Sequence, residues 1–101
     1  MAQVVFSRNA ASNLDRLYRF LSEKNPQAAA RAIMTILERL GTLSRFPRIG
    51  RVDPERSDTR ELFMPLGATG YVARYRLIEG VVTVMAVRYM REAGYTSSTD
   101  E

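Results

Sequence analysis

The sequence of 101 residues contains no cysteine, no histidine and no tryptophan, and Lys24 is its single lysine. Without cysteine the chain forms neither a disulfide scaffold nor a thiolate metal site. Without histidine any metal would need carboxylates alone, and the usual general base near neutral pH is missing. Hydrolysis by a Ser-His-Asp triad is therefore excluded, and we expect no metal or other cofactor.

Long hydrophobic runs are also missing. The longest, Val81 to Val87, is interrupted by Thr83, whereas a helix that spans a bilayer needs about 20 apolar residues. The first eight residues lack the basic flank and apolar stretch of a secretory signal. These features predict a cytoplasmic protein that has no contact with a membrane.

Length and charge narrow the class of protein further. A chain of 101 residues with 46% apolar residues predicts one domain with its own core, which we place at residues 1–95, with a disordered polar tail at residues 96–101. The net charge is +4 and nearly all basic residues are arginine. Arginine binds carboxylates and phosphates through a planar fork, so acidic protein and nucleic acid are both plausible partners.

The first half of the chain predicts a short strand followed by two helices. Residues 3–6 are β-prone, and Ser7 can cap a helix over about residues 8–23, where apolar residues recur every three or four positions. Asn25-Pro26 ends that helix and begins a second one, which runs to about Ser44. The short connection predicts antiparallel neighbours.

The second half predicts three antiparallel strands after a polar loop at Asp53 to Asp58. The strands are Arg60 to Met64, Tyr71 to Ile78 and Val81 to Tyr89, and Glu79-Gly80 forms a tight turn between the last two. The expected fold is therefore α+β, with a short N-terminal strand and an antiparallel helical hairpin packed on one face of a small sheet.

Basic residues on the last two strands form the first candidate site. Arg74 and Arg76 share one face of their strand by the period of two, and Arg88 lies on the neighbouring strand. Such a patch can hold an RNA backbone or pair with an acidic protein segment. It can equally be a solvated outer face in which cross-strand pairs form with Glu61 and Glu79.

A second basic set spans the end of the second helix and the loop, and comprises Arg39, Arg45, Arg48, Arg51, Arg56 and Arg60. Arg45 and Arg48 near a helix C-terminus also satisfy the helix dipole without any partner. On the first helix, the face opposite the apolar stripe carries Asn9, Asn13, Arg16, Arg19 and Glu23. The simplest interpretation of that face is a solvated one.

Short motifs run in order through residues 3–95: Ala10 with Leu14-Asp15, Asn25-Pro26 with Ala28-Ala29, Leu40 to Leu43, Phe46-Pro47 with Gly50-Arg51, Arg60-Glu61-Leu62, Gly70-Tyr71 with Tyr75-Arg76, and Val87-Arg88 with Arg91 to Tyr95. In this order and layout they resemble the RelE/ParE superfamily of toxins from bacterial toxin-antitoxin modules. The resemblance implies one of two activities: RelE-like members cut mRNA on the ribosome, and ParE-like members poison DNA gyrase.

The residues that the RelE-like activity implies are largely missing. That activity relies on lysines in the second strand of the family fold, an arginine after the Gly-Tyr of the third, an arginine at the end of the fourth and a C-terminal tyrosine. Here the second strand has no lysine and Val72 stands at the arginine position, which leaves Tyr95 with Arg88 or Arg91. Loss of one donor to a developing phosphate charge costs about 2.7–4 kcal/mol.

The resemblance therefore favours the ParE-like branch, a gyrase inhibitor that binds its target and stabilises plasmids through growth arrest. The Asn25-Pro26-x-Ala-Ala hairpin and the Pro47-x-x-Gly50-Arg51 segment also look more like this branch. The alternative is a RelE-like mRNA endoribonuclease with ribosome and mRNA as partners, in which Arg88, Arg91 and Tyr95 are catalytic. A third hypothesis is an inactive member that only joins an antitoxin or DNA complex.

The resemblance also implies a cognate antitoxin, in a hetero-oligomer, whose partly disordered segment wraps the toxin. We expect acidic side chains of that segment to contact Arg74, Arg76 and Arg88. The expected contacts with the target are Arg16, Arg19, Arg91 and Tyr95.

Overall fold

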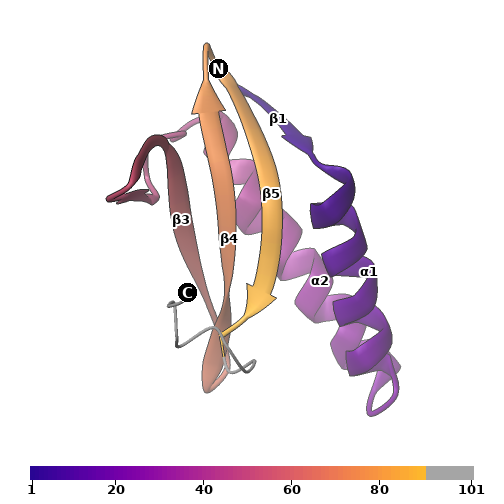
Figure 1. Cartoon of the computed structure of the whole chain (residues 1–101). Helices are drawn as coiled ribbons and strands as arrows, with labels where there is room; N and C mark the ends of the chain where they lie inside the picture. The colour runs from indigo at the N-terminus through magenta and orange to yellow at the C-terminus, as the bar shows by residue number, and fades with distance from the viewer. Residues whose placement is uncertain (91–101) are drawn as a thin grey trace.

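A computed structural model describes residues 1–90 of the chain (Figure 1). Its elements are β1 (Gln3–Phe6), α1 (Arg8–Ser22), α2 (Pro26–Gly41), the short 3-10 helix η1 (Thr42–Ser44), β2 (Arg51–Asp53), β3 (Arg56–Leu66), β4 (Thr69–Ile78) and β5 (Val81–Tyr89). Within this part of the chain, no helix is long and apolar enough to cross a membrane. Arg91, Tyr95 and the predicted tail lie outside the described residues.

Both helices begin at the residues that the sequence indicates. The Ser7 side chain caps α1 by accepting a hydrogen bond from the Ala10 amide at 3.0 Å, and the Asn25 side chain caps α2 by accepting from the Gln27 and Ala28 amides, both at 3.1 Å. The two helices run antiparallel on one side of the sheet (Figure 1). The α-helical part of the second helix ends at Gly41, and residues 42–44 continue as η1.

The sheet has five strands in the order β1-β5-β4-β3-β2, in which β1 runs parallel to β5 and the other pairs are antiparallel. This confirms the α+β class. The predicted polar loop at Asp53 to Asp58 is wrong, because β2 ends at Asp53 and β3 begins at Arg56. Pro54 and Glu55 form the turn between the two strands, and the largely polar residues around them carry no apolar alternation that reveals a strand.

The hydrophobic core lies between the helices and one face of the sheet. Ile36 and Leu40 of α2 pack in one cluster with Tyr75, Val84 and Val87 of the sheet, and all five are at most 2% exposed. Because side chains alternate along a strand, the residues between these positions point to the opposite face. No helix covers that outer face within residues 1–90 (Figure 1).

Polar side chains of α1 attach this helix to β5. The Asn13 Oδ1 accepts a hydrogen bond from the Val87 amide at 2.9 Å, and the Asn9 side-chain amide donates to the Met85 carbonyl, also at 2.9 Å. The pairing of β5 with β4 shifts register next to this point, between Arg74 and Tyr75. The predicted solvated face is therefore wrong at Asn13, which is buried and satisfies a backbone group that the β-ladder leaves free.

Candidate functional site

Two of the three predicted outer-face arginines form ion pairs within the chain. The Arg74 guanidinium lies 2.7 Å from the Asp53 carboxylate and 3.6 Å from that of Glu61, and Arg76 lies 3.9 Å from Asp58. The predicted pair with Glu61 is confirmed, whereas the ion pairs of the described residues do not include Glu79. The carboxylates of β2 and β3 thus neutralise much of the patch.

Arg88 differs from the other two. It lies opposite Val72 in the register of β4 and β5, and its exposed side chain makes no ion pair with another residue of the range 1–90. Directly opposed residues share a face, so Arg88 and Val72 are neighbours on the outer face. Arg74 is the next residue of β4 on the same face. Arg51 also lies on this face, opposite Glu61, and forms no ion pair within residues 1–90, so Arg51 and Arg88 are both available to a partner.

The centre of the outer face is apolar. Val72 is only 7% exposed, and Phe63 lies opposite it on β3. A groove of about 460 Å³ opens here, and its lining includes Ile49, Arg51, Glu61, Phe63, Val72 and Met90. Ile49 and Phe63 are about half exposed, so the groove offers apolar contact area between charged rims, which the sequence alone did not reveal.

Tyr75 holds the loop that supplies one wall of this groove. Its hydroxyl donates a hydrogen bond to the Pro47 carbonyl at 2.7 Å and accepts one from the Gly50 amide at 2.9 Å. Burial raises the pKa of the Tyr75 phenol, and the Gly50 hydrogen bond and the Arg60 charge oppose this rise more weakly. The phenol is thus neutral and structural, and its two bonds place Ile49 beside the outer face.

The predicted target contacts on α1 lie on the other side of the sheet. Arg19 pairs with Asp15 at 2.8 Å, one helical turn away, and both side chains are largely exposed. Arg16 lines a second groove, of about 240 Å³, between α1 and β5, together with Asn13, Leu17, Phe20, Val87 and Tyr89. The structure therefore separates Arg16 and Arg19 from Arg74 and Arg88, while Arg91 and Tyr95 lie outside the described residues.

Two features of residues 1–90 bear on catalysis. Among residues 1–90 no group of three acidic side chains gathers in a way that could hold a metal ion. On the outer face, Val72 stands beside Arg88, and β3 contributes Phe63 and Glu61 in place of lysines. This arrangement suits the binding of a protein segment better than the stabilisation of a phosphate in a transition state.

Comparisons with known proteins agree with this fold. Residues 4–94 match the family described as the ParE toxin of the type II toxin-antitoxin system, parDE. The chain is 35% identical to Toxin RelE3 of Caulobacter vibrioides over 91% of its length and 98% of that protein, and 38% identical to Toxin RelE1 of the same organism over 83% and 88%. A structure of the chromosomal ParDE system from P. aeruginosa superposes with a TM-score of 0.71 at 23% identity, over 88% of this chain and 96% of that one.

Proposed function

Because the chain belongs to the ParE toxin family of type II toxin-antitoxin systems, we propose that it arrests growth by binding and inhibiting DNA gyrase. The observation that carries this proposal is the apolar centre of the outer face. At the position where RNA cleavage requires a cation, Val72 is 7% exposed and packs beside Phe63. Inhibition through binding needs no such cation, and the proposal therefore assigns this chain no catalytic residue.

The charge distribution supports binding over cleavage. RNA cleavage by the 2′-hydroxyl builds negative charge on the phosphate, and each missing donor costs about 2.7–4 kcal/mol. Arg74 and Arg76 are held by Asp53, Glu61 and Asp58, so Arg88 alone among these three is free of an ion pair with the described residues. Among residues 1–90, Arg51 and Arg88 remain near the groove without an ion pair, and neither replaces the donor that is missing at Val72.

The proposed contacts with gyrase are Arg16 and Arg19 of the helical hairpin, together with Arg91 and Tyr95. The groove beside Arg16 is lined by Leu17 and Phe20, and Phe20 is 52% exposed. A cation beside an exposed aromatic side chain is a common composition of protein-binding surfaces. Such a toxin stabilises a plasmid that encodes both proteins, because cells that lose the plasmid also lose the antitoxin and stop dividing.

A cognate antitoxin neutralises the toxin in this proposal, in a hetero-oligomer of the two proteins. The outer-face groove suits a segment that carries apolar side chains for Ile49, Phe63 and Val72 and a carboxylate for Arg88. Arg74 and Arg76 contribute less, because an incoming carboxylate competes with Asp53 and Asp58. Of the three predicted arginines, we therefore expect Arg88 to contribute most to binding of the antitoxin.

A second candidate function is supported by the names of the curated relatives, Toxin RelE3 and Toxin RelE1. It is ribosome-dependent cleavage of mRNA, with Arg88, Arg91 and Tyr95 as the catalytic residues. Tyrosine and arginine can act as acid and electrostatic catalyst without histidine. This function requires that the outer face bind RNA beside Val72.

Expression of the chain in two strains that differ only in gyrase separates these functions. We expect growth arrest in the sensitive strain and normal growth in a strain whose gyrase resists ParE-type toxins. Arrest of both strains contradicts the gyrase proposal and favours the ribosome. Normal growth of both, with protein present, indicates an inactive family member.

A further inference from the structure

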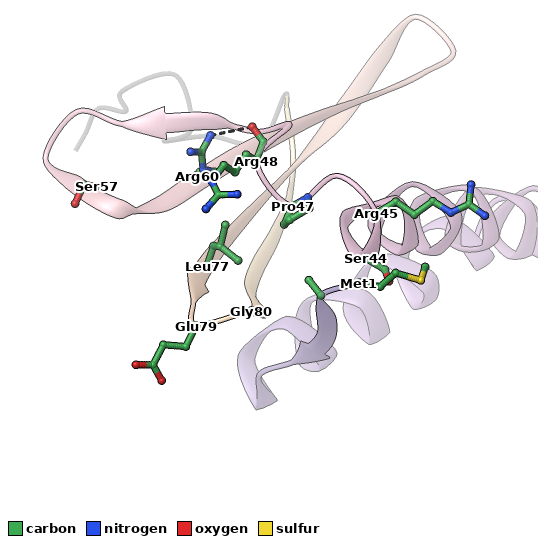
Figure 2. A pocket seen from close by; sticks show the side chains of 11 residues that line it. Met1, Ser44, Arg45, Pro47, Arg48, Ser57, Arg60, Leu77, Glu79 and Gly80 are labelled. Atoms are coloured by element: carbon green, nitrogen blue, oxygen red, sulfur yellow. Dashed lines mark hydrogen bonds between the residues drawn. The ribbon is translucent and has the colours of Figure 1, made fainter.

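A second basic surface lies at the end of the sheet where β4 turns into β5, apart from the outer-face groove. There η1, the loop after it and the beginning of β3 surround a pocket of about 550 Å³ (Figure 2). Its lining comprises Met1, Ala2, Ser44, Arg45, Pro47, Arg48, Ser57, Arg60, Leu77, Glu79 and Gly80. Three arginines and two serine hydroxyls thus share the lining with a single carboxylate.

These arginines are not neutralised within the described chain. None of the ion pairs formed by residues 1–90 involves Arg45, Arg48 or Arg60. Figure 2 shows Arg48 and Arg60 together on one wall, whereas the Glu79 side chain points away from them. The helix dipole accounts for a cation at Arg45, directly after η1, but it does not account for Arg48 in the loop or for Arg60 on a strand.

The Arg60 guanidinium is held in place before any ligand arrives. Its Nη1 donates to the Arg48 carbonyl, as Figure 2 shows, and to the Gly50 carbonyl, both at 2.9 Å. A guanidinium carries five N–H donors on three nitrogens, and these two bonds use one nitrogen. An ordered cation with donors to spare loses little side-chain entropy when it binds an anion.

The composition of the lining indicates the class of anion. Arginine forks and hydroxyl groups are the usual donors to phosphate oxygens. Within residues 1–90 no aromatic side chain lines the pocket, whereas proteins that hold single strands stack the bases on aromatic rings. We propose that this pocket binds the phosphate backbone of duplex DNA, independently of sequence and separately from the inhibition of gyrase.

Fluorescence anisotropy with a labelled duplex of about 20 base pairs tests the proposal on the purified full chain, over a series of salt concentrations. The variant R48A removes a cation from the wall that Arg48 shares with Arg60, and R31A removes an exposed cation from α2 as a charge-matched control. Each phosphate contact contributes about 0.9 to the slope of log K against log salt. We expect R48A to lower the slope by about 0.9 and R31A to leave it unchanged.

A second variant, S57E, places a carboxylate at the edge of the pocket without removing an arginine, and we expect it to weaken binding as well. Urea unfolding of each variant establishes that the fold persists. Equal slopes for R48A and R31A overturn the proposal, because they show a non-specific effect of net charge. Tighter binding of a single-stranded RNA of the same length, or equal competition by an acidic peptide, overturns the choice of duplex DNA.

Discussion

The phenol of Tyr75 fills the space that a side chain at position 50 would need. A Cβ on Gly50 would lie 2.6 Å from the Tyr75 hydroxyl oxygen, 2.7 Å from its ring and 2.9 Å from the Glu61 carbonyl oxygen. The same hydroxyl accepts the Gly50 amide and donates to the Pro47 carbonyl. The glycine therefore allows the loop to close on β4 and to deliver Ile49 to the outer-face groove.

Substitution of Gly50 by alanine tests this contact. We expect Gly50→Ala to lower the free energy of unfolding by about 1–3 kcal/mol, because neither the backbone of Glu61 nor the buried ring can yield. Gly41→Ala is the matched control: it lies at the end of α2 with no atom within 4 Å of its Cβ, and it should add about 0.5–1 kcal/mol. Urea unfolding measures both, and equal effects would contradict the account.

Removal of the Tyr75 hydroxyl should cost stability at neutral pH and change its pH dependence. Tyr75→Phe leaves the buried Gly50 amide and the partly buried Pro47 carbonyl without this partner, a loss of about 1–3 kcal/mol. Because burial raises the pKa of Tyr75 above 10.0, the unfolded chain releases this proton first, and stability falls as pH rises beyond about 10. Denaturant titrations from about pH 8 to 11 should show a shallower fall for Tyr75→Phe than for Tyr18→Phe; identical profiles would be inconsistent with the buried phenol.

Asn13 should matter far more than its neighbour one turn earlier on α1. Asn13→Ala leaves the buried Val87 amide without its acceptor, so we expect a loss of about 1–3 kcal/mol. Asn9→Ala removes an exposed hydrogen bond to Met85 and should cost less than about 1 kcal/mol. Thermal unfolding of the two variants compares them directly, and an equal cost would show that Asn13 does not anchor β5.

The sequence pattern predicts most of the elements because their signals are local. Ser7 and Asn25 cap helices through hydrogen bonds to residues two or three positions ahead, and Glu79-Gly80 closes its turn with both residues at positive φ. The pairing of Arg51 to Asp53 with β3 is local but lacks the apolar alternation of a strand, whereas the burial of Asn13 and the outer-face groove depend on residues far apart in the chain. Residue periodicity carries no information about such contacts. It therefore predicts that Asn13 is exposed to solvent and that Arg74, Arg76 and Arg88 form one patch.

Arg88 should contribute most of the arginine-dependent affinity for the antitoxin. We expect Arg88→Glu to raise the Kd of the complex at least tenfold, about 1.4 kcal/mol, because it places a charge of the wrong sign beside the groove, opposite Val72. Arg74→Glu serves as the comparison, since Asp53 and Glu61 already neutralise Arg74, and we expect it to have the smaller effect. Calorimetry at physiological salt measures both, and a larger effect at Arg74 would reject the assignment.

The target of the toxin, DNA gyrase or the ribosome, can be identified in one experiment with two parallel reactions. Purified toxin, free of antitoxin, is incubated with DNA gyrase, ATP and supercoiled plasmid, beside a translation reaction that reports cleavage of mRNA. We expect cleaved plasmid to accumulate and the mRNA to stay intact. Val72 and the ion-paired Arg74 and Arg76 leave too little positive charge for RNA cleavage. Codon-positioned cuts in the mRNA with an unaffected plasmid would contradict this expectation, and would show that Arg88, with Arg91 and Tyr95, forms a working nuclease.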